Sequence, residues 1–158
     1  MPAKSTRSAR PAQSAAKLDD FLCFAVYSTN LAFTKVYRPI LEEVGLTYTQ
    51  YVTLVALSEE DDQTVGGLGA KLFLESNTLT PILKKLEAMG LVERARDKAN
   101  ERQVRVTLTK NGRRLREKVA TADLKAACGL SATQFARLQK EIVALRERML
   151  LWVGEAAA

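Results

Sequence analysis

The sequence has no histidine, and its two cysteines, Cys23 and Cys128, are too few to staple a domain. The lack of histidine excludes serine–histidine and cysteine–histidine nucleophile pairs and most zinc sites. Two thiols also exclude zinc ribbons and disulfide-rich secreted modules, which favours a reducing, cytoplasmic compartment. No apolar run approaches the about 18 residues of a membrane span. We therefore expect a protein without a cofactor, a metal ion or membrane insertion.

The length and charge of the chain indicate one domain with an anionic partner. Its 158 residues, 47% of them hydrophobic, suffice for a core that needs no disulfide. The formal net charge is +6, but four basic residues lie in the first 17 positions, among Ala, Ser, Gln and Pro. This stretch lacks the hydrophobic segment of a secretory signal, so we expect residues 1–17 to be a disordered basic tail. The folded domain is expected over residues 18–154 and is only mildly basic.

Apolar residues that recur every three or four positions predict four helices in the first part of the chain, at about 18–39, 48–57, 65–73 and 77–89. Pro39 should end or kink the first helix. The sequence Thr-Tyr-Thr-Gln at 47–50 has the form of a capping box, which opens the second helix. Pro81 is tolerated only near a helix start, so the fourth helix should begin around Asn77 or Thr78, and Gly90 stops it.

After Gly90 the hydrophobic period changes from that of a helix to that of a strand. Residues 91–96 and 102–108 read as two strands, joined by the polar turn 97–101. These segments predict a two-stranded hairpin with a charged tip. Thr109 then caps a long helix that runs to about residue 127.

The last helix has the pattern of a dimerisation helix. A second capping box, at 131–134, opens it. Its apolar residues repeat at alternating spacings of three and four, which is the a/d seam of nearly three heptads: Phe135, Leu138, Ile142, Leu145, Met149 and Trp152. A helix packed within one chain can show the same stripe, but this one follows the completed middle of the domain. We therefore expect a homodimer.

The order helix, helix, charged hairpin over residues 48–108 is that of a winged helix-turn-helix. The predicted fold class is mainly α with a small β-hairpin wing and an α-helical dimerisation region. Hydroxyl, amide and basic side chains near a helix start can reach base edges or phosphates in a major groove. The candidates on this helix are Ser76, Asn77, Thr78, Thr80, Pro81, Lys84 and Lys85.

Basic side chains of the hairpin could neutralise phosphates or enter a minor groove, and the candidates are Arg96, Lys98, Arg102 and Arg105, with Arg94 in the same hairpin. Each residue alone has an ordinary alternative role. The polar residues before the helix could be caps, and an arginine-rich hairpin could serve only solubility.

Three segments of this region closely resemble the MarR family of transcriptional regulators: LTPILKKLEAMGLV at 79–92, NERQV at 100–104 and LTKNG at 108–112. The resemblance covers roughly residues 20–152. It implies a homodimer with two winged-helix lobes on a pseudopalindromic operator, a recognition helix matching 77–85, and a wing arginine, Arg102, in the minor groove. The family usually has an aspartate that braces this arginine where the chain has Asn100, which leaves open how the wing is ordered here.

Cys23 is followed by tyrosines that could support a reactive thiolate. Tyr27 lies one turn beyond it on the same helix face, and Tyr37 and Tyr48 follow. Phenolic hydroxyls donate hydrogen bonds that favour the charged, nucleophilic form of a thiol. Tyr37 lies about 21 Å from Cys23 along a continuous helix. A contact between them requires either a sharp fold at Pro39 or the partner subunit.

This spacing is similar to that of the organic-hydroperoxide-sensing branch of the MarR family, the OhrR repressors. The resemblance implies that Cys23 is the peroxide-reactive thiol and that Tyr37 and Tyr48 hydrogen-bond to it across the dimer. Cys128 resembles the resolving cysteine of the two-cysteine subgroup. There the oxidised thiol forms a disulfide with the other subunit, and the lobes leave the DNA.

Three other functions remain open at this point. A MarR-type repressor could be released by a small phenolic ligand, with Cys23 incidental. A thiol peroxidase could use Cys23 catalytically, although such an enzyme needs neither the heptad seam nor the charged hairpin. A purely architectural DNA-binding protein would leave the cysteine and tyrosines without a role. Each cysteine could also be a simple packing residue.

Overall fold

The computed structural model describes residues 17–119 and 127–156. The predicted tail, residues 1–17, therefore lies outside the described residues except for Lys17. The chain divides between Tyr37 and Arg38 into two compact units. The elements in chain order are a 3-10 turn (Leu18–Asp20), α1 (Leu22–Glu42), α2 (Tyr48–Glu59), β1 (Gln63–Thr64), α3 (Val65–Leu72), α4 (Ser76–Ala88), β2 (Val92–Arg96), β3 (Val104–Leu108), α5 (Lys110–Val119) and α7 (Ala132–Ala156).

Helix α1 continues past Pro39, so this proline does not end the helix, and the other alternative, a kink, stays a prediction. A proline removes one backbone donor, but the bonds of the turns on either side remain. The last turn is supported by Arg38, whose Nε donates to a carboxylate oxygen of Glu42 at 2.7 Å. The helix ends at Glu42, and the turn that follows includes Gly45, whose φ of +70° suits a residue without a side chain.

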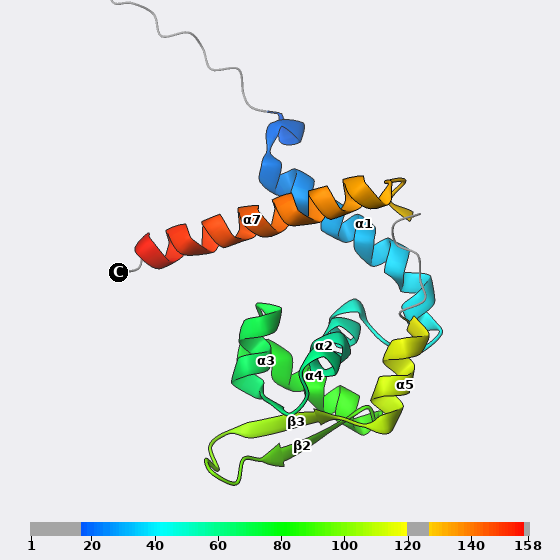
Figure 1. Ribbon diagram of the computed structural model, residues 1–158, viewed down its shortest axis with the longest axis vertical. Coiled ribbons are helices and arrows are strands. Elements are labelled where there is room, and N and C mark those ends of the chain that lie inside the picture. Colours follow the sequence, from blue (N-terminus) through cyan, green and yellow to red (C-terminus); the bar gives the residue numbers. More distant parts are fainter. Residues whose placement is uncertain (1–16, 120–126, 157–158) are drawn as a thin grey trace, which may run out of the picture. The chain divides into compact units, whose positions relative to one another are not determined.

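Helices α2, α3 and α4 enclose the core of the second unit beside the sheet, with α5 packed against α2 (Figure 1). The capping box at the start of α2 is confirmed. Thr47 Oγ1 accepts from the Gln50 N–H at 3.3 Å, and Gln50 Oε1 accepts from the Thr47 N–H at 2.8 Å. The largest fully buried side chains are mostly aliphatic: Leu54, Leu57, Leu68, Leu79, Leu83, Leu86, Val92 and Val106, with Thr53.

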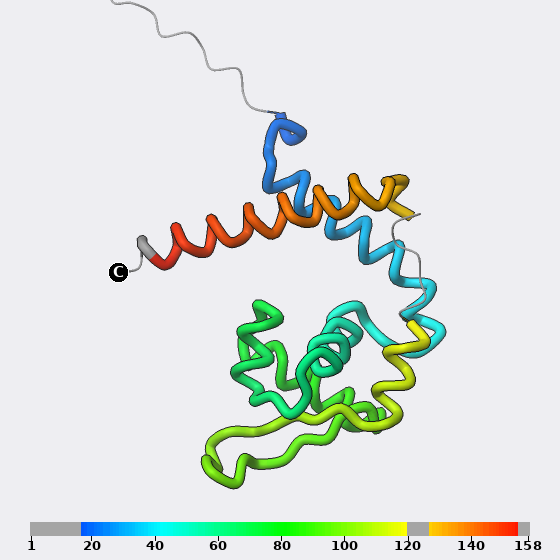
Figure 2. Tube along the Cα trace, in the orientation of Figure 1, coloured from blue at the N-terminus to red at the C-terminus, as the bar shows by residue number. Residues whose placement is uncertain are grey.

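The predicted hairpin is present, but it belongs to a sheet of three strands rather than two. The strand order is β1-β3-β2 and both pairs are antiparallel, with Val92 opposite Leu108 and Arg96 opposite Val104. The tube in Figure 2 shows β2 and β3 side by side with their connecting turn at the end of the hairpin. Strand β1 has only two residues, too few for an alternating pattern, so the sequence did not indicate it.

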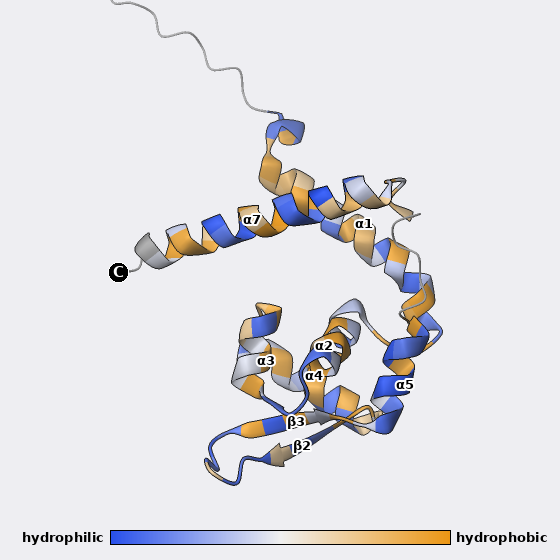
Figure 3. Ribbon diagram, in the orientation of Figure 1, coloured by the Kyte–Doolittle hydropathy of each residue, from blue (hydrophilic) through white to orange (hydrophobic). Residues whose placement is uncertain are grey.

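Helix α5 begins as expected, because Thr109 Oγ1 accepts from the Gly112 N–H at 3.0 Å. Its predicted continuation over residues 120–126 lies outside the described residues. The capping box of α7 is confirmed by Gln134 Oε1, which accepts from the Ser131 N–H at 2.9 Å. Helix α7 has hydrophobic and hydrophilic residues along its length (Figure 3). Four apolar side chains of its seam are about half exposed or more: Leu138, Ile142, Met149 and Trp152.

Gly112 offers a test of the packing between α5 and the sheet. A Cβ at this position would lie 2.2 Å from the Leu91 carbonyl oxygen and 2.8 Å from a methyl carbon of Leu108. Gly112→Ala should therefore lower the free energy of unfolding by about 1–3 kcal/mol, measured by urea denaturation. The control is Gly66→Ala in α3, where a Cβ meets nothing within 4 Å. The control should leave stability unchanged or raise it by up to about 1 kcal/mol. Equal stability of the two variants would contradict this packing.

Candidate nucleic-acid interface and thiol sites

Helix α4 presents its predicted polar residues to solvent. It begins at Ser76, one residue before the earliest expected start, which places Pro81 at its sixth residue. Leu79, Leu83 and Leu86 are fully buried on one face. The exposed residues of the other face are Ser76, Asn77, Thr78, Pro81, Lys84 and Lys85, and Thr80 is half-buried. This face has the side chains that could read or grip a nucleic acid.

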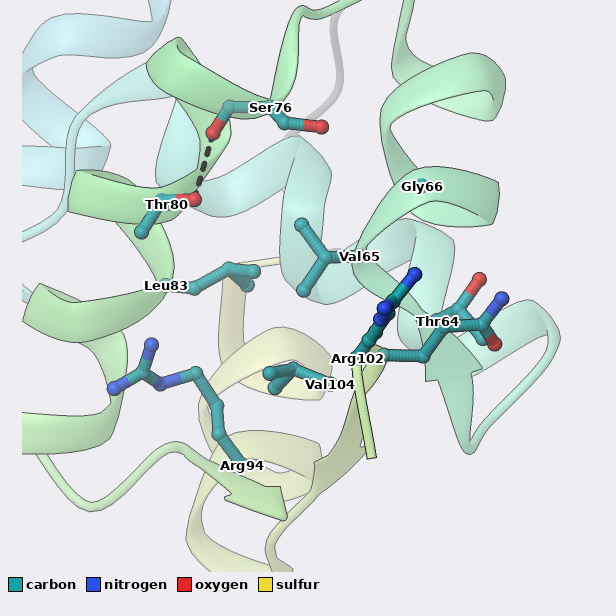
Figure 4. A pocket seen from close by; sticks show the side chains of 10 residues that line it. Thr64, Val65, Gly66, Ser76, Thr80, Leu83, Arg94, Arg102 and Val104 are labelled. Atoms are coloured by element: carbon teal, nitrogen blue, oxygen red, sulfur yellow. Dashed lines mark hydrogen bonds between the residues drawn. The ribbon is translucent and has the colours of Figure 1, made fainter. Parts of the chain in front are cut away.

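Some of these polar groups also bond locally, but none of them caps the helix, because the N-cap is Glu75 and its side chain forms no capping hydrogen bond. Thr80 Oγ1 donates to the Ser76 carbonyl oxygen at 2.6 Å, which is the dashed line in Figure 4. Thr78 Oγ1 lies 3.2 Å from Asn77 Oδ1. The Thr80 hydroxyl thus serves the helix itself, whereas the two lysines of α4 form no ion pair with any described residue.

A hollow of about 340 Å³ separates the start of α4 from the wing (Figure 4). In this view Val104 lies between the two arginines of the lining, and Val65 and Leu83 lie on the side toward Ser76 and Thr80. The lining residues are Thr64, Val65, Gly66, Ser76, Thr80, Leu83, Arg94, Arg102, Gln103 and Val104.

The basic residues of the wing fall into two groups. Arg96, Lys98 and Arg102 are exposed and form no ion pair with any described residue. Arg94, in contrast, donates through Nε and Nη2 to one carboxylate oxygen of Glu87 at 2.9 and 2.7 Å. These hydrogen bonds hold the pKa of Glu87 below its ordinary value and tie β2 to the end of α4.

Arg105 also belongs to the paired group. Its Nε donates to Asp62 Oδ1 at 2.8 Å and its Nη1 donates to Asp97 Oδ2 at 3.2 Å. Asp97 Oδ1 in turn accepts from the Ala99 N–H at 2.8 Å. That backbone bond and the Arg105 side chain are the main causes that lower the pKa of Asp97. The role of Arg105 as a DNA contact stays a prediction. Its side chain lies between Asp62 and Asp97 and bonds to both, and we call these three residues the clamp.

Two further polar anchors are present, of which Asp61 was not identified from the sequence. Asp61 Oδ1 accepts from the Leu108 N–H at 2.8 Å, and the same carboxylate pairs with Arg113 of α5. Burial alone would raise the pKa of Asp61, but these donors and the Asp62 N–H lower it. Asn100 Oδ1 accepts from the backbone N–H of Arg102 at 3.2 Å, so it orders the wing turn rather than bracing an arginine side chain. The sequence showed only an acidic turn at 59–62, which is more than 40 residues from Leu108 and Arg113, the partners of Asp61.

The Cys23 thiol is exposed on α1. Tyr27, one turn later, is 58% exposed, and Tyr37 is half-buried on the same helix. Because α1 is continuous between Cys23 and Tyr37, the two side chains are about 21 Å apart along one chain and cannot touch. Of the two routes left open by the sequence, a sharp fold of the chain is therefore excluded.

Tyr48 and Cys128 are the other candidates for the thiol chemistry. Burial raises the pKa of the Tyr48 hydroxyl, and the neighbouring Tyr51 adds to the rise. A phenol keeps its proton at neutral pH even at its ordinary pKa of about 10, so this hydroxyl can donate a hydrogen bond. Cys128 is half-buried and has a free thiol, immediately before Gly129 with its φ of +63°.

No helix among the described residues is long and apolar enough to cross a membrane. Within the same residues, no group of three or more His, Cys, Asp or Glu side chains is placed to hold a metal ion.

Residues 35–119, more than half of the chain, match the family of transcriptional regulators described as SarA/Rot. The chain belongs to this MarR-like winged-helix family. It is 48% identical over 118 residues to the HTH-type transcriptional regulator TtmR of Methylorubrum extorquens, which covers 75% of this chain and only 60% of TtmR. It is 43% identical over 102 residues to the organic hydroperoxide resistance transcriptional regulator of Bacillus subtilis, which covers 65% of this chain and 69% of that protein.

Solved structures confirm the winged-helix fold expected for a SarA/Rot-family chain. The reduced, DNA-bound form of AbfR is 34% identical, with a TM-score of 0.73 over 86% of this chain and 94% of AbfR. A disulfide form of AbfR is 38% identical, with a TM-score of 0.59 over 81% of this chain and 91% of AbfR. AbfR is a protein of Staphylococcus epidermidis. The resemblance to MarR-type regulators that the sequence motifs indicated is thus confirmed.

The anchors of the wing make its stability sensitive to acid. The carboxyls of Asp61 and Asp97 have lowered pKa values in the folded chain, so they stabilise it above their unfolded pKa of about 3.9. The free energy of unfolding should be nearly constant from pH 7 to about 5 and fall as the pH drops through the folded pKa values. Asp61→Asn should be less stable at pH 7 and lose less stability below about pH 4, measured by chemical denaturation. Glu43→Gln, an exposed control with no ion pair among the described residues, should follow the unmodified chain. An unchanged acid profile for Asp61→Asn would contradict the assignment.

Proposed function

We propose that this chain is a non-enzymatic transcriptional repressor, that it binds a pseudopalindromic operator as a homodimer, and that oxidation of Cys23 by an organic hydroperoxide releases it. The observation that carries the DNA-binding part is the exposed polar face of α4 beside three exposed wing cations. Relatives in the same family support the redox part, since one is named for organic hydroperoxide resistance and AbfR occurs in reduced and disulfide forms.

The buried stripe of α4 leaves its polar face exposed to solvent, which supports a role of that face in DNA contact. Asn77 and Thr78 at its first turn reach base edges in the major groove, and Lys84 and Lys85 contact phosphates. The wing residues Arg96, Lys98 and Arg102 contact the flanking backbone or minor groove. Ser76, Thr80 and Pro81 line the same end of the helix.

The exposed apolar side chains of α1 and α7 support the homodimer. Leu22, Leu31, Met149 and Trp152 are each 44–71% exposed in the single chain. Burial of such side chains between two copies stabilises the assembly by about 25 cal/mol per Å² of apolar surface removed from water. A two-fold dimer presents two α4 helices to neighbouring turns of the operator.

The chemistry at Cys23 is a two-electron oxidation. The thiolate attacks the O–O bond of the hydroperoxide, one oxygen is transferred to sulfur as sulfenic acid, and the other leaves as an alcohol after protonation. The Cys128 thiol of the partner subunit then displaces water from the sulfenic acid and forms the disulfide. Two equivalents of a small thiol reduce this bond and restore the repressor.

The tyrosines support the reactive thiol. Because α1 separates Cys23 from Tyr37 within one chain, the Tyr37 that donates to the Cys23 thiolate comes from the partner subunit. Tyr48 is a second donor, because a phenol keeps its proton at neutral pH. Tyr27 lies one turn from Cys23 and lines its surroundings.

The thiol switch can be tested by intact mass and non-reducing gel mobility before and after one equivalent of cumene hydroperoxide per subunit. The unmodified chain should form a covalent dimer that is lost in Cys23→Ser and in Cys128→Ser. Cys23→Ser should still bind DNA and should no longer respond to peroxide. Sustained peroxide turnover with a reductant would instead indicate a thiol peroxidase. If both thiols of the unmodified chain stay unoxidised, the thiol switch is wrong, and a repressor released by a small ligand becomes the better hypothesis.

The DNA contacts can be tested with a fluorescent duplex selected from random sequences by binding to the full chain. Arg102→Gln and Lys84→Gln should each weaken binding by about 1–3 kcal/mol and lower the slope of log K against log salt by about 1. Lys140→Gln removes the same charge from an exposed position on α7 and should have little effect. An equal loss in all three variants would assign the binding to general charge rather than to the proposed surface.

A further inference from the structure

Arg105 occupies the centre of the three-stranded sheet. It pairs in register with Thr64 of β1 on one side and with Ala95 of β2 on the other. Its neighbours in β3, Val104 and Val106, point to the opposite, core side of the sheet, because side chains alternate along a strand. Arg105 therefore lies on the outer face, where the small Ala95 side chain leaves room for it.

On this face the guanidinium joins two segments that are 35 residues apart in the sequence. One partner is Asp97 at the start of the wing turn, whose side chain is only 14% exposed. The other is Asp62 at the entry to β1, which offers both its carboxylate and its backbone carbonyl. Arg105 itself is 38% exposed. Its donors are thus directed at fixed acceptors of the chain rather than at solvent.

The Asp62 end of this connection is itself anchored. Asp62 has a φ of +55°, a conformation that aspartate and asparagine tolerate better than most residues. The preceding residue, Asp61, accepts from the Leu108 N–H and pairs with Arg113 of α5. The turn at 61–62 therefore holds β3, α5 and, through Arg105, the wing turn.

The Asp97 end orders the wing turn directly. While Asp97 Oδ2 binds Arg105, Oδ1 accepts from the backbone N–H groups of Ala99 and Asn100 at 2.8 and 3.3 Å. The two oxygens of one carboxylate thus connect the wing turn with the centre of the sheet. This turn carries Lys98 and leads to Arg102.

We propose that Arg105 is a positioning residue that fixes the wing turn for DNA entry, and that it is not itself a DNA ligand. This inference rests on the proposed DNA binding. It gives a different role to Arg105, which the sequence placed among the phosphate contacts on the basis of its charge alone. Asp62 and Asp97 are the other members of the clamp. The clamp connects the wing turn to the centre of the sheet. It orders the wing in a chain that has Asn100 where the family usually has the bracing aspartate.

The clamp and a phosphate contact predict opposite effects when a carboxylate is removed. If Arg105 bound a phosphate, neutralising Asp97 would free the arginine and remove a negative charge near the DNA, and binding would tighten. If Arg105 positions the wing, the same change loosens the turn and weakens binding. Asparagine preserves the shape of both aspartates, so Asp97→Asn and Asp62→Asn isolate the ion pairs.

The experiment measures binding of each full-length variant to the selected duplex. We expect Asp97→Asn, Asp62→Asn and Arg105→Gln each to weaken binding about three- to tenfold. The double variant Arg105→Gln/Asp97→Asn should be no weaker than the weaker single variant, because both changes break one interaction. Glu101→Gln neutralises an exposed carboxylate of the same turn that has no ion pair among the described residues, and it should bind equally or more tightly.

A measurement without DNA separates the clamp from the proposed function. In Arg105→Gln, amide hydrogen exchange at Ala99 and Asn100 should accelerate at least about threefold. Lys98→Gln, an exposed control in the same turn, should leave these rates unchanged. If no duplex binds the unmodified chain, the proposed function is wrong. The exchange rates at Ala99 and Asn100 still show whether Arg105 orders the wing turn.

Two results would overturn the clamp. One is tighter binding by Asp97→Asn, together with a drop of about 1 in the salt slope for Arg105→Gln, which would make Arg105 a phosphate ligand. The other is unchanged exchange at Ala99 and Asn100 in Arg105→Gln, which would show that the turn is ordered without it.

Discussion

The complete burial of one leucine stripe on α4 is the constraint on which the candidate interface depends. Leu79, Leu83 and Leu86 have no exposed surface, and each such side chain stabilises the fold by about 1.5–3 kcal/mol relative to exposure. A helix with one side fixed in this way has no freedom to rotate, so its polar side faces outward. The same packing sets Glu87 beside Arg94 and joins the helix to β2. Helix α4 and the wing are thereby held as one unit.

The wing has little core of its own and depends on polar anchors. Its hairpin is fixed at the helix side by Glu87 and Arg94 and at the sheet centre by Arg105 with two aspartates. These pairs are partly shielded from water, which strengthens them relative to fully exposed pairs. Two basic residues of the wing, Arg94 and Arg105, are neutralised by these pairs. The other three, Arg96, Lys98 and Arg102, are exposed and form no ion pair with any described residue.

The thiol chemistry depends on a different constraint, the continuity of α1. A straight helix separates Cys23 from Tyr37 too widely for contact, so any donor at that position comes from another copy of the chain. In the switch that we propose, the sensor is divided between two subunits, so oxidation is coupled to the geometry of the dimer and hence to the spacing of its two α4 helices. A monomeric peroxidase would have no need of this arrangement.

The sequence by itself determined the helix and hairpin order, the caps at Thr47, Thr109 and Ser131, and the family, because these depend on local periodicity and on contiguous motifs. It also indicated the buried face of α4, since a stripe at helical spacing has one packing solution. It allowed a helix end at Pro39, where α1 in fact continues, and it lacked the two-residue strand β1, because neighbouring turns and a strand partner 41–43 residues away decide those. The tertiary structure alone decided which arginines are free. Arg94, Arg102 and Arg105 look alike in a row of residues, but only the folded sheet brings Glu87, Asp62 and Asp97 within hydrogen-bond distance of two of them.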